Sequence, residues 1–231
     1  MKRCKKYEAA AKLIDSAKEY TVAEAAALIK ETNTTKFDST VDISFALNVD
    51  PTKADQLVRG TLVLPHGNGK SKKILVITAN KQEEAQAAGA DFVGAKDMLD
   101  KIVNENWFGF DVMIATPDMM GELGKMGMGR ILGPKGLMPN PKTGTVTMDL
   151  AKAISDIKRG KIVYRVDRDG NLNISIARCS FDAAKIADNI ETVLEAVAKS
   201  RPSTIKGKFI KSCVIHTTMG PGVKLTFAAK N

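Results

Sequence analysis

Histidine and cysteine are scarce in this chain, which removes most of the common routes to metal binding and nucleophilic catalysis. The 231 residues include two histidines, His66 and His216, and three cysteines, Cys4, Cys179 and Cys213. The cysteines are odd in number and lie far apart without CxxC spacing, so they support neither a disulfide framework nor a thiolate metal site. We expect a reducing compartment, no metal and no cofactor.

Long apolar segments are missing as well. No run of 18 apolar residues occurs, and the basic start MKRCKKYEAAAKLIDSAKEY lacks the continuous apolar stretch of a secretion signal. We therefore expect a cytoplasmic protein that neither enters a membrane nor is exported.

Catalytic signatures are also lacking. The chain has no HExxH motif, no serine in a nucleophile elbow and no conspicuous carboxylate pair. Residues 124–146 are glycine-rich, but the spacing in GMGRILG is one residue too wide for a dinucleotide-binding loop, and prolines follow where a helix should begin. Gly69-Lys70-Ser71 matches the end of a phosphate-binding loop, yet Leu64 stands where its first glycine belongs. We predict that the chain is not an enzyme; nucleotide-binding measurements would test the alternative of a nucleotide-dependent enzyme.

What the chain does have is an excess of positive charge. Lys and Arg number 35 against 26 Asp and Glu, a net charge of +9. This surplus favours a polyanionic partner such as nucleic acid or an anionic membrane surface, with a merely basic soluble protein as the alternative. Residues 68–159 hold 13 basic and 11 acidic side chains, and the other 22 basic and 15 acidic residues give the rest of the chain +7. We expect the polyanion contact mainly outside residues 68–159.

Hydrophobic periodicity changes along the chain. Alternating apolar and polar residues predict strands with one buried face near both ends of the chain, and helices accompany them. The predicted strands are 40–48, 162–166, 172–176 and 209–217, with a hairpin turn at Asp169-Gly170. The predicted helices are 5–19, 25–30 after a capping box of Thr21 and Glu24, and a third from a Ser180 cap to the residues before Arg201-Pro202.

The middle of the chain has a different pattern. Continuous apolar strands at 74–78, 92–93 and 112–115 alternate with helices at 82–88, 96–104 and 150–158, which is typical of a small parallel sheet covered on both faces. The sequence thus predicts an α+β protein of two domains. Residues 1–67 and 160–231 would form a discontinuous, sandwich-like α/β domain with a mainly antiparallel sheet that binds RNA. Residues 68–159 would form an inserted, Rossmann-like α/β domain, joined by two crossings that act as a hinge.

Residues 124–146 are predicted to be an exposed loop. The loop carries spaced cations and methionines, namely Lys125, Arg130, Lys135 and Lys142 with Met126, Met128 and Met138. Flexible apolar side chains beside cations suit an adaptable surface for RNA or protein. The alternative is that the methionines fill the core of the inserted domain.

Two alternatives concern the last predicted strand. Its sequence resembles one strand of an RNA-recognition motif, but Lys208 occupies an aromatic position of that motif and Phe209 lies on the predicted core face. A pure protein-interaction module without RNA affinity also stays open. His216, on the polar face of the strand, is predicted to be a surface contact and not a general base.

Four long segments carry a resemblance to a known family. They are KFDSTVDISFALNVDP (36–51), VRGTLVLPHGNGK (58–70), GRILGPKGLMPNPKTGTV (129–146) and HTTMGPG (216–222). Together they resemble the bacterial type of the large-subunit ribosomal protein one family, the protein of the mobile stalk beside the tRNA exit site. The resemblance covers nearly the whole chain.

The resemblance implies a structural ribosomal protein that performs no chemistry. The domain built from both chain ends would bind a folded region of large-subunit ribosomal RNA. The same surface would bind the messenger of the protein's own operon and repress its translation. The swing of the stalk would assist release of deacylated tRNA from the exit site. The free protein would be a monomer, and the assembled one part of the large subunit in the cytoplasm.

Carried over by position, the resemblance also implies an RNA-binding surface. Its residues would be Lys36, Phe37, Thr40, Arg165, Asp167, Ser212, His216, Thr217, Thr218, Met219 and Gly220, and a secondary RNA or tRNA contact would comprise Lys125, Arg130, Lys135 and Lys142. Hydroxyls would meet 2′-OH groups and phosphates, Gly220 would let the backbone approach closely, and Met219 would lie against a ribose or base. A small hydroxyl residue is expected where this chain has His216, which leaves the role of that side chain open. As alternatives, Met219 plugs the edge of the sheet and Phe37 belongs to the core.

Overall fold

The computed structural model describes residues 4–205 and 207–226, and the chain divides into two compact units. Unit 1 consists of residues 1–69 and 162–231, and unit 2 of residues 70–161. The boundaries expected from the sequence lie two residues before each of these points. The chain therefore enters unit 2 once and leaves it once.

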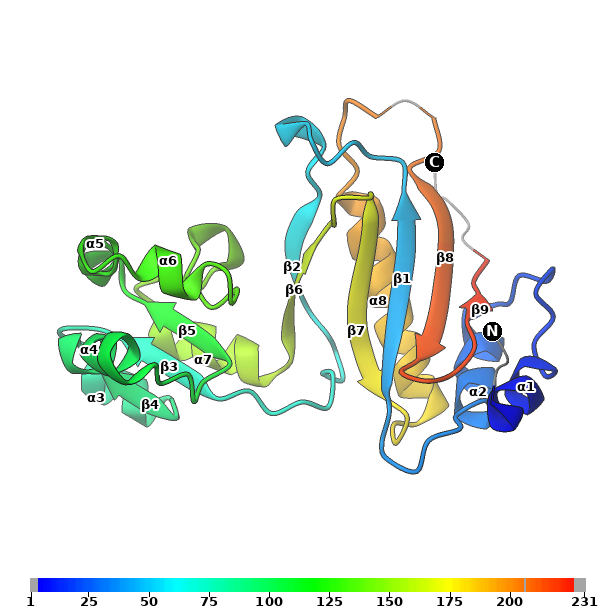
Figure 1. The fold of residues 1–231 in the computed structure, drawn as a ribbon, viewed down its shortest axis with the longest axis horizontal. Helices are drawn as coiled ribbons and strands as arrows, with labels where there is room; N and C mark the ends of the chain where they lie inside the picture. The colour runs from blue at the N-terminus through cyan, green and yellow to red at the C-terminus, as the bar shows by residue number, and fades with distance from the viewer. Residues whose placement is uncertain (1–3, 206, 227–231) are drawn as a thin grey trace. The chain divides into compact units, whose positions relative to one another are not determined.

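Unit 1 is built on a four-stranded antiparallel sheet with the order β7-β1-β8-β9. The strands are β1 (Thr40–Leu47), β7 (Asn171–Arg178), β8 (Ile210–Thr217) and β9 (Val223–Lys224). Burial along β1 alternates residue by residue, as its sequence predicts. The buried side chains of β1 share one hydrophobic core with helices α2 (Val22–Glu31) and α8 (Ala183–Lys199), and α8 runs behind β7 and β1 in Figure 1. The other face of the sheet carries polar side chains that are half-buried or exposed.

The predicted hairpin at Asp169-Gly170 is only partly right. The turn itself forms, because the Asp167 N–H donates to Asn171 O over 2.8 Å and the Asp167 carboxylate accepts from two backbone N–H groups of the turn. The strands on either side, however, belong to different sheets. β6 (Lys161–Arg165) pairs with β2 (Arg59–Val63) in a separate two-stranded sheet, whereas β7 pairs with β1. The turn therefore passes the chain from one sheet to the other.

The first helix is shorter than predicted. α1 spans Lys5–Ala11 and not 5–19. Past its end, the Asp15 N–H donates to the Tyr20 hydroxyl and the Asp15 carboxylate accepts from the Ala17 N–H, both over 2.9 Å. Such local side-chain bonds offer the backbone an alternative to helix.

The capping box of Thr21 and Glu24 is confirmed at the start of α2. The Ser180 cap is wrong, because α8 begins at Ala183 with Asp182 in the N-cap position. Ser180 instead donates both its N–H and its hydroxyl to the carboxylate of Asp38.

Unit 2 contains the predicted parallel sheet. Its order is β4-β3-β5, formed by β3 (Ile74–Ile77), β4 (Phe92–Gly94) and β5 (Val112–Ala115). Helices α3 (Gln82–Ala87), α4 (Lys96–Glu105) and α7 (Leu150–Lys158) follow the predicted positions, and two separate hydrophobic cores use alternate residues of β3. An antiparallel sheet in one unit and a parallel sheet in the other confirm the predicted α+β class.

The exposed loop predicted for residues 124–146 contains regular structure. This region contains the end of helix α5 (Pro117–Lys125), helix α6 (Met128–Leu132) and the short 3-10 turn η2 (Pro141–Thr143). A second 3-10 turn, η1 (Ala54–Gln56), precedes β2 in unit 1. Met128 is fully buried and Met126 and Met138 pack against the same core of unit 2. The methionines therefore fill the core, as the alternative held.

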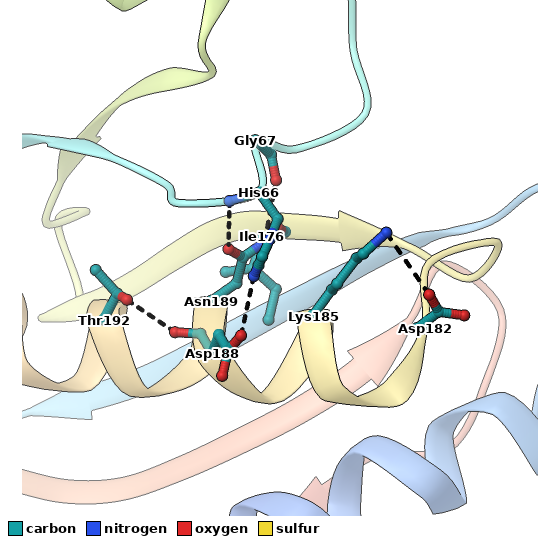
Figure 2. Close-up of polar contacts among 8 residues, drawn as sticks. All are labelled: His66, Gly67, Ile176, Asp182, Lys185, Asp188, Asn189 and Thr192. Carbon is teal, nitrogen blue, oxygen red and sulfur yellow. Dashed lines mark hydrogen bonds and ion pairs between the residues drawn. The ribbon is translucent and has the colours of Figure 1, made fainter.

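A buried asparagine ties the last residues before unit 2 to α8 (Figure 2). The Asn189 side-chain amide donates to Gly67 O over 3.0 Å and to Ile176 O over 2.9 Å, and its oxygen accepts the His66 N–H over 3.3 Å. His66 Nε2 lies 2.9 Å from Asp188 Oδ2 on the same helix. Because the Asn189 side chain is fully buried, its three hydrogen bonds are largely shielded from water and fix the course of residues 66–67, whereas the His66–Asp188 contact is exposed.

Candidate nucleic-acid interface

Three segments that are far apart in the sequence meet at one end of the four-stranded sheet. β1 is antiparallel to both β7 and β8, so the start of β1 lies beside the last residues of its two neighbours. Thr40 is paired with Arg178 and Val41 with Thr217. We call this the sheet end; it comprises residues 36–40, 178–180 and 217–220.

Thr218 continues the pairing of β8 with β1 beyond the last strand residue. Its N–H donates to Thr40 O over 3.1 Å, and its hydroxyl oxygen accepts the Thr40 N–H over 3.2 Å. The Thr218 side chain is nevertheless exposed, so the hydroxyl is held in a defined direction while it can still bond to a ligand.

Thr217 points the other way. Its side chain is 2% exposed, and its hydroxyl has no hydrogen-bond partner among the residues that the structure describes. The hydroxyl lies directly under Gly220, where a methyl group would overlap it, and the Gly220 N–H closes the turn on Thr217 O. Any larger residue than glycine would lift this turn. The burial of Thr217 removes its side chain from the surface that a ligand could touch.

Two large apolar side chains stand out into solvent at the sheet end. Phe37 is 58% exposed and Met219 is 61% exposed. The alternatives that placed Phe37 in the core and Met219 as a plug of the sheet edge are therefore wrong. Lys36 beside them is also exposed. The sheet end combines a cation, a ring, a thioether and oriented polar groups on one surface.

Other residues expected in the same surface lie at the opposite end of the sheet. Ser212 is paired with Ala46 near the end of β1, and Arg165 and Asp167 lie around the turn that leads into β7. Six residues separate Ser212 from Thr218, which corresponds to about 20 Å along a strand. The Asp167 carboxylate is already engaged within its own turn. The structure does not bring these three residues to the sheet end.

His216 lies on the polar face of the sheet, one residue before the part of β8 that belongs to the sheet end. It is half-buried, with Nε2 at 3.3 Å from Ser44 Oγ and Nδ1 at 3.2 Å from Thr217 O, and it is paired with Asp42 of β1. Both ring nitrogens thus have neighbours within the sheet. This arrangement suits a group that organises the face between strands.

The four cations expected to make a secondary contact all lie on unit 2. Lys125 ends α5, Arg130 belongs to α6, Lys142 to η2, and Lys135 follows α6 with its ammonium 3.9 Å from the centre of the Phe108 ring. All four are exposed. Lys125, Arg130 and Lys142 belong to helical segments, whereas Lys135 lies in the turn after α6.

Comparison with known proteins assigns the chain to a family. A model of the ribosomal protein L1p/L10e family matches residues 29–221, which is most of the chain. A large ribosomal subunit protein uL1 from Mesoplasma florum is 56% identical over 213 residues, covering 92% of this chain and 93% of that protein. The chain belongs to the ribosomal protein L1p/L10e family. The resemblance seen in the sequence is confirmed.

Membership of the L1p/L10e family also decides the question of catalysis. Its members are structural ribosomal proteins without enzymatic activity, which confirms that this chain is not an enzyme.

Within residues 4–205 and 207–226, no helix has the length and apolar character needed to cross a bilayer, and no group of three or more His, Cys, Asp or Glu could hold a metal ion.

The cysteines of this L1p/L10e protein differ in accessibility. Burial raises the pKa of the Cys213 thiol to about 12, and burial, offset in part by a hydrogen bond with Ser39, raises the pKa of Cys179. Cys4 is exposed. We expect iodoacetamide at pH 7.5 to modify Cys4 first and Cys213 only in denaturant, because the thiolate is the reactive form. Peptide mass spectrometry over time would show the order, and rapid labelling of Cys213 in the folded protein would contradict it.

Sequence reasoning missed part of the sheet end of this family member. Arg178 and Ser180 both donate hydrogen bonds to Asp38 there, although 140 residues separate Asp38 from Arg178. The sequence offered no reason to include Asp38 in the RNA surface, because its negative charge repels the phosphates of RNA.

Proposed function

We propose that unit 1 binds a folded region of large-subunit ribosomal RNA through the sheet end. The exposure of Phe37 and Met219, both in segments of the sheet end, supports this most directly, because neither side chain contributes to the core. Solvent-exposed rings and thioethers offer apolar faces for bases and riboses, and neighbouring cations such as Lys36 neutralise phosphates. The charge of the chain outside residues 68–159 agrees with this placement.

The sheet end suits RNA better than DNA. The Thr218 hydroxyl is fixed by its bonds with Thr40, and the Gly220 backbone presents no side chain between the turn and a ligand. A fixed hydroxyl close to an unobstructed backbone is well placed to bond to a 2′-OH group, which DNA lacks. Recognition would follow the shape of the RNA and not a long base sequence.

A filter-binding titration tests this function. The probe is a transcript of the stalk region of large-subunit ribosomal RNA, measured with excess tRNA as competitor. We expect saturable binding of the transcript and much weaker binding of a DNA copy with the same sequence. Equal affinity for the RNA and the DNA copy, or displacement of the transcript by tRNA, would show that the protein does not recognise the folded stalk RNA selectively.

Lys36→Ala is expected to lower the salt dependence of this binding. Each phosphate contact contributes about 0.7–0.9 to the slope of log affinity against log salt, and Lys36 is the exposed cation nearest to Phe37 in the sequence. Titrations at several salt concentrations measure the slope. Lys199→Ala removes the same charge from the end of α8 and serves as the control; equal slopes in both variants would mean that Lys36 contacts no phosphate.

Regulation of translation follows from the same surface. We propose that the sheet end also binds a similarly folded element in the messenger of the protein's own operon, so that free protein represses its own synthesis. A substitution that lowers the affinity for ribosomal RNA should lower the affinity for the messenger by a similar factor. A variant that separates the two affinities would show that different surfaces are used.

On the assembled large subunit in the cytoplasm, we propose that the protein forms the mobile stalk and assists release of deacylated tRNA from the exit site. Lys125, Arg130, Lys135 and Lys142 of unit 2 would supply a secondary contact with RNA or tRNA. Their exposure supports this, because exposed cations can neutralise the phosphates of a passing ligand. We expect the free protein to be a monomer.

A further inference from the structure

An aspartate lies in the middle of the proposed RNA surface. Asp38 follows Lys36 and Phe37 and precedes β1, and it is exposed. Its carboxylate accepts two hydrogen bonds from Ser180: the Ser180 N–H donates to Oδ1 over 3.0 Å and the hydroxyl donates to Oδ2 over 2.9 Å. Both oxygens of the side chain are thus bonded to one residue just beyond the end of β7.

The main chain around Asp38 is held by the same segment. Arg178 Nη1 donates to Asp38 O over 2.9 Å, and the Cys179 N–H donates to Ser39 O over 2.9 Å. With the bond between the Ser39 hydroxyl and the Cys179 thiol, residues 178–180 make five hydrogen bonds to residues 38–39. On the other side, the Thr35 hydroxyl donates to Phe37 O over 3.0 Å. The backbone that carries Lys36 and Phe37 is bonded at both ends.

Charge alone gives the opposite expectation for this position. A carboxylate beside a phosphate backbone repels it, so removal of the Asp38 charge should tighten binding slightly. The hydrogen bonds of Asp38 give a different expectation, because a loop that is ordered before binding does not lose that freedom when RNA arrives.

We propose that Asp38 is a positioning residue for RNA binding, which with Ser180 holds Lys36 and Phe37 in the conformation that meets the RNA. This inference rests on the proposed function of the sheet end. Without the carboxylate, the loop samples several conformations, and the apparent affinity falls by the fraction of molecules in the competent one. The cost of a negative charge near the RNA is smaller than the benefit of an ordered loop.

Four variants test the proposal in titrations with the stalk transcript. Asp38→Ala is expected to weaken binding roughly three- to tenfold, the effect of losing one to two ordinary hydrogen bonds that order a loop. Ser180→Ala, which changes no charge, is expected to weaken binding in the same direction. The double variant should be no weaker than Asp38→Ala, since both changes remove one interaction. Asp38→Asn keeps an oxygen acceptor for Ser180 and should bind close to wild type.

Asp55→Ala is the matched control. Asp55 is an exposed aspartate in η1, after β1 and not before it, so its removal makes the same charge change away from the sheet end. We expect wild-type affinity or slightly tighter binding for this variant. The salt slope of Asp38→Ala should equal that of wild type because no phosphate contact is lost, and its thermal midpoint should fall by no more than a few degrees because the lost hydrogen bonds lie at the exposed surface.

The outcomes separate this inference from the function on which it rests. Wild-type protein that fails to bind the transcript overturns both. Wild-type binding together with Asp38→Ala binding as tightly as Asp55→Ala overturns the positioning role alone. A double variant much weaker than either single variant would also overturn it, because the two residues would then act separately.

Discussion

Met219→Ala is expected to weaken binding of the stalk transcript by roughly 1–3 kcal/mol, about a 5- to 150-fold rise in Kd. Met219 exposes most of its side chain at the turn after β8 and contributes little to the core. The thioether is removed from water only when RNA covers it. The substitution should therefore lower the affinity for RNA and leave the free energy of unfolding almost unchanged. Filter binding at a fixed salt concentration measures the Kd, and a denaturant titration measures the free energy of unfolding.

Met148→Ala provides the control for this prediction. Met148 is 48% exposed and lies on unit 2, so the substitution removes the same side chain from a comparable environment outside the sheet end. Its affinity for the transcript should equal that of wild type. If Met219→Ala binds as well as Met148→Ala, the thioether does not touch RNA.

Asn189→Ala is expected to lower the free energy of unfolding by roughly 2–4 kcal/mol, since it leaves buried carbonyl and amide groups without partners. The side chain is fully buried and bonds to His66, Gly67 and Ile176 at once. Loss of these bonds detaches residues 66–67 from α8 as well as weakening the core. Urea unfolding followed by circular dichroism measures the change.

Glu191→Ala on the same helix is the control for Asn189. Glu191 is exposed, and surface substitutions of this kind usually change stability by less than about 0.5 kcal/mol. Limited proteolysis adds a local readout: cleavage near His66 should accelerate in Asn189→Ala and not in the control. Equal stability of the two variants would show that water replaces the buried bonds at no cost.

Most strands of both units could be predicted because their patterns are local, whereas β2 and β9 were not predicted. The alternation in β1 and the continuous apolar run of β3 each report which faces are buried. The capping box at Thr21 is local as well. The partners of the strands at Asp169-Gly170 could not be predicted, because a tight turn does not determine whether its strands pair with each other or with β2 and β1. Helix α6 was not predicted, because glycines in and around it are typical of loops. Its buried face is formed by Met128 and Leu132.

The sheet end shows the same limit at the level of the site. Positions next to the strand termini were predictable, since Phe37 and Met219 stand beside recognisable motifs. The inward direction of Thr217 follows from the alternation of β8, in which Cys213, Ile215 and Thr217 are all buried, but the resemblance by position placed Thr217 in the RNA surface. The bonds of Asp38 depend on a register between β1 and β7 that only the folded chain defines.

The pairing of β2 with β6 bears on how the chain could be re-engineered. These two strands lead toward and away from residues 70–161, and the Val166 N–H bonds to Val58 O over 2.9 Å beside them. A flexible tether of a few glycines and serines in place of the insert would therefore join strands that are already neighbours. The remaining polypeptide would keep the sheet end, and another domain could be inserted at the same junction without separating the two strands.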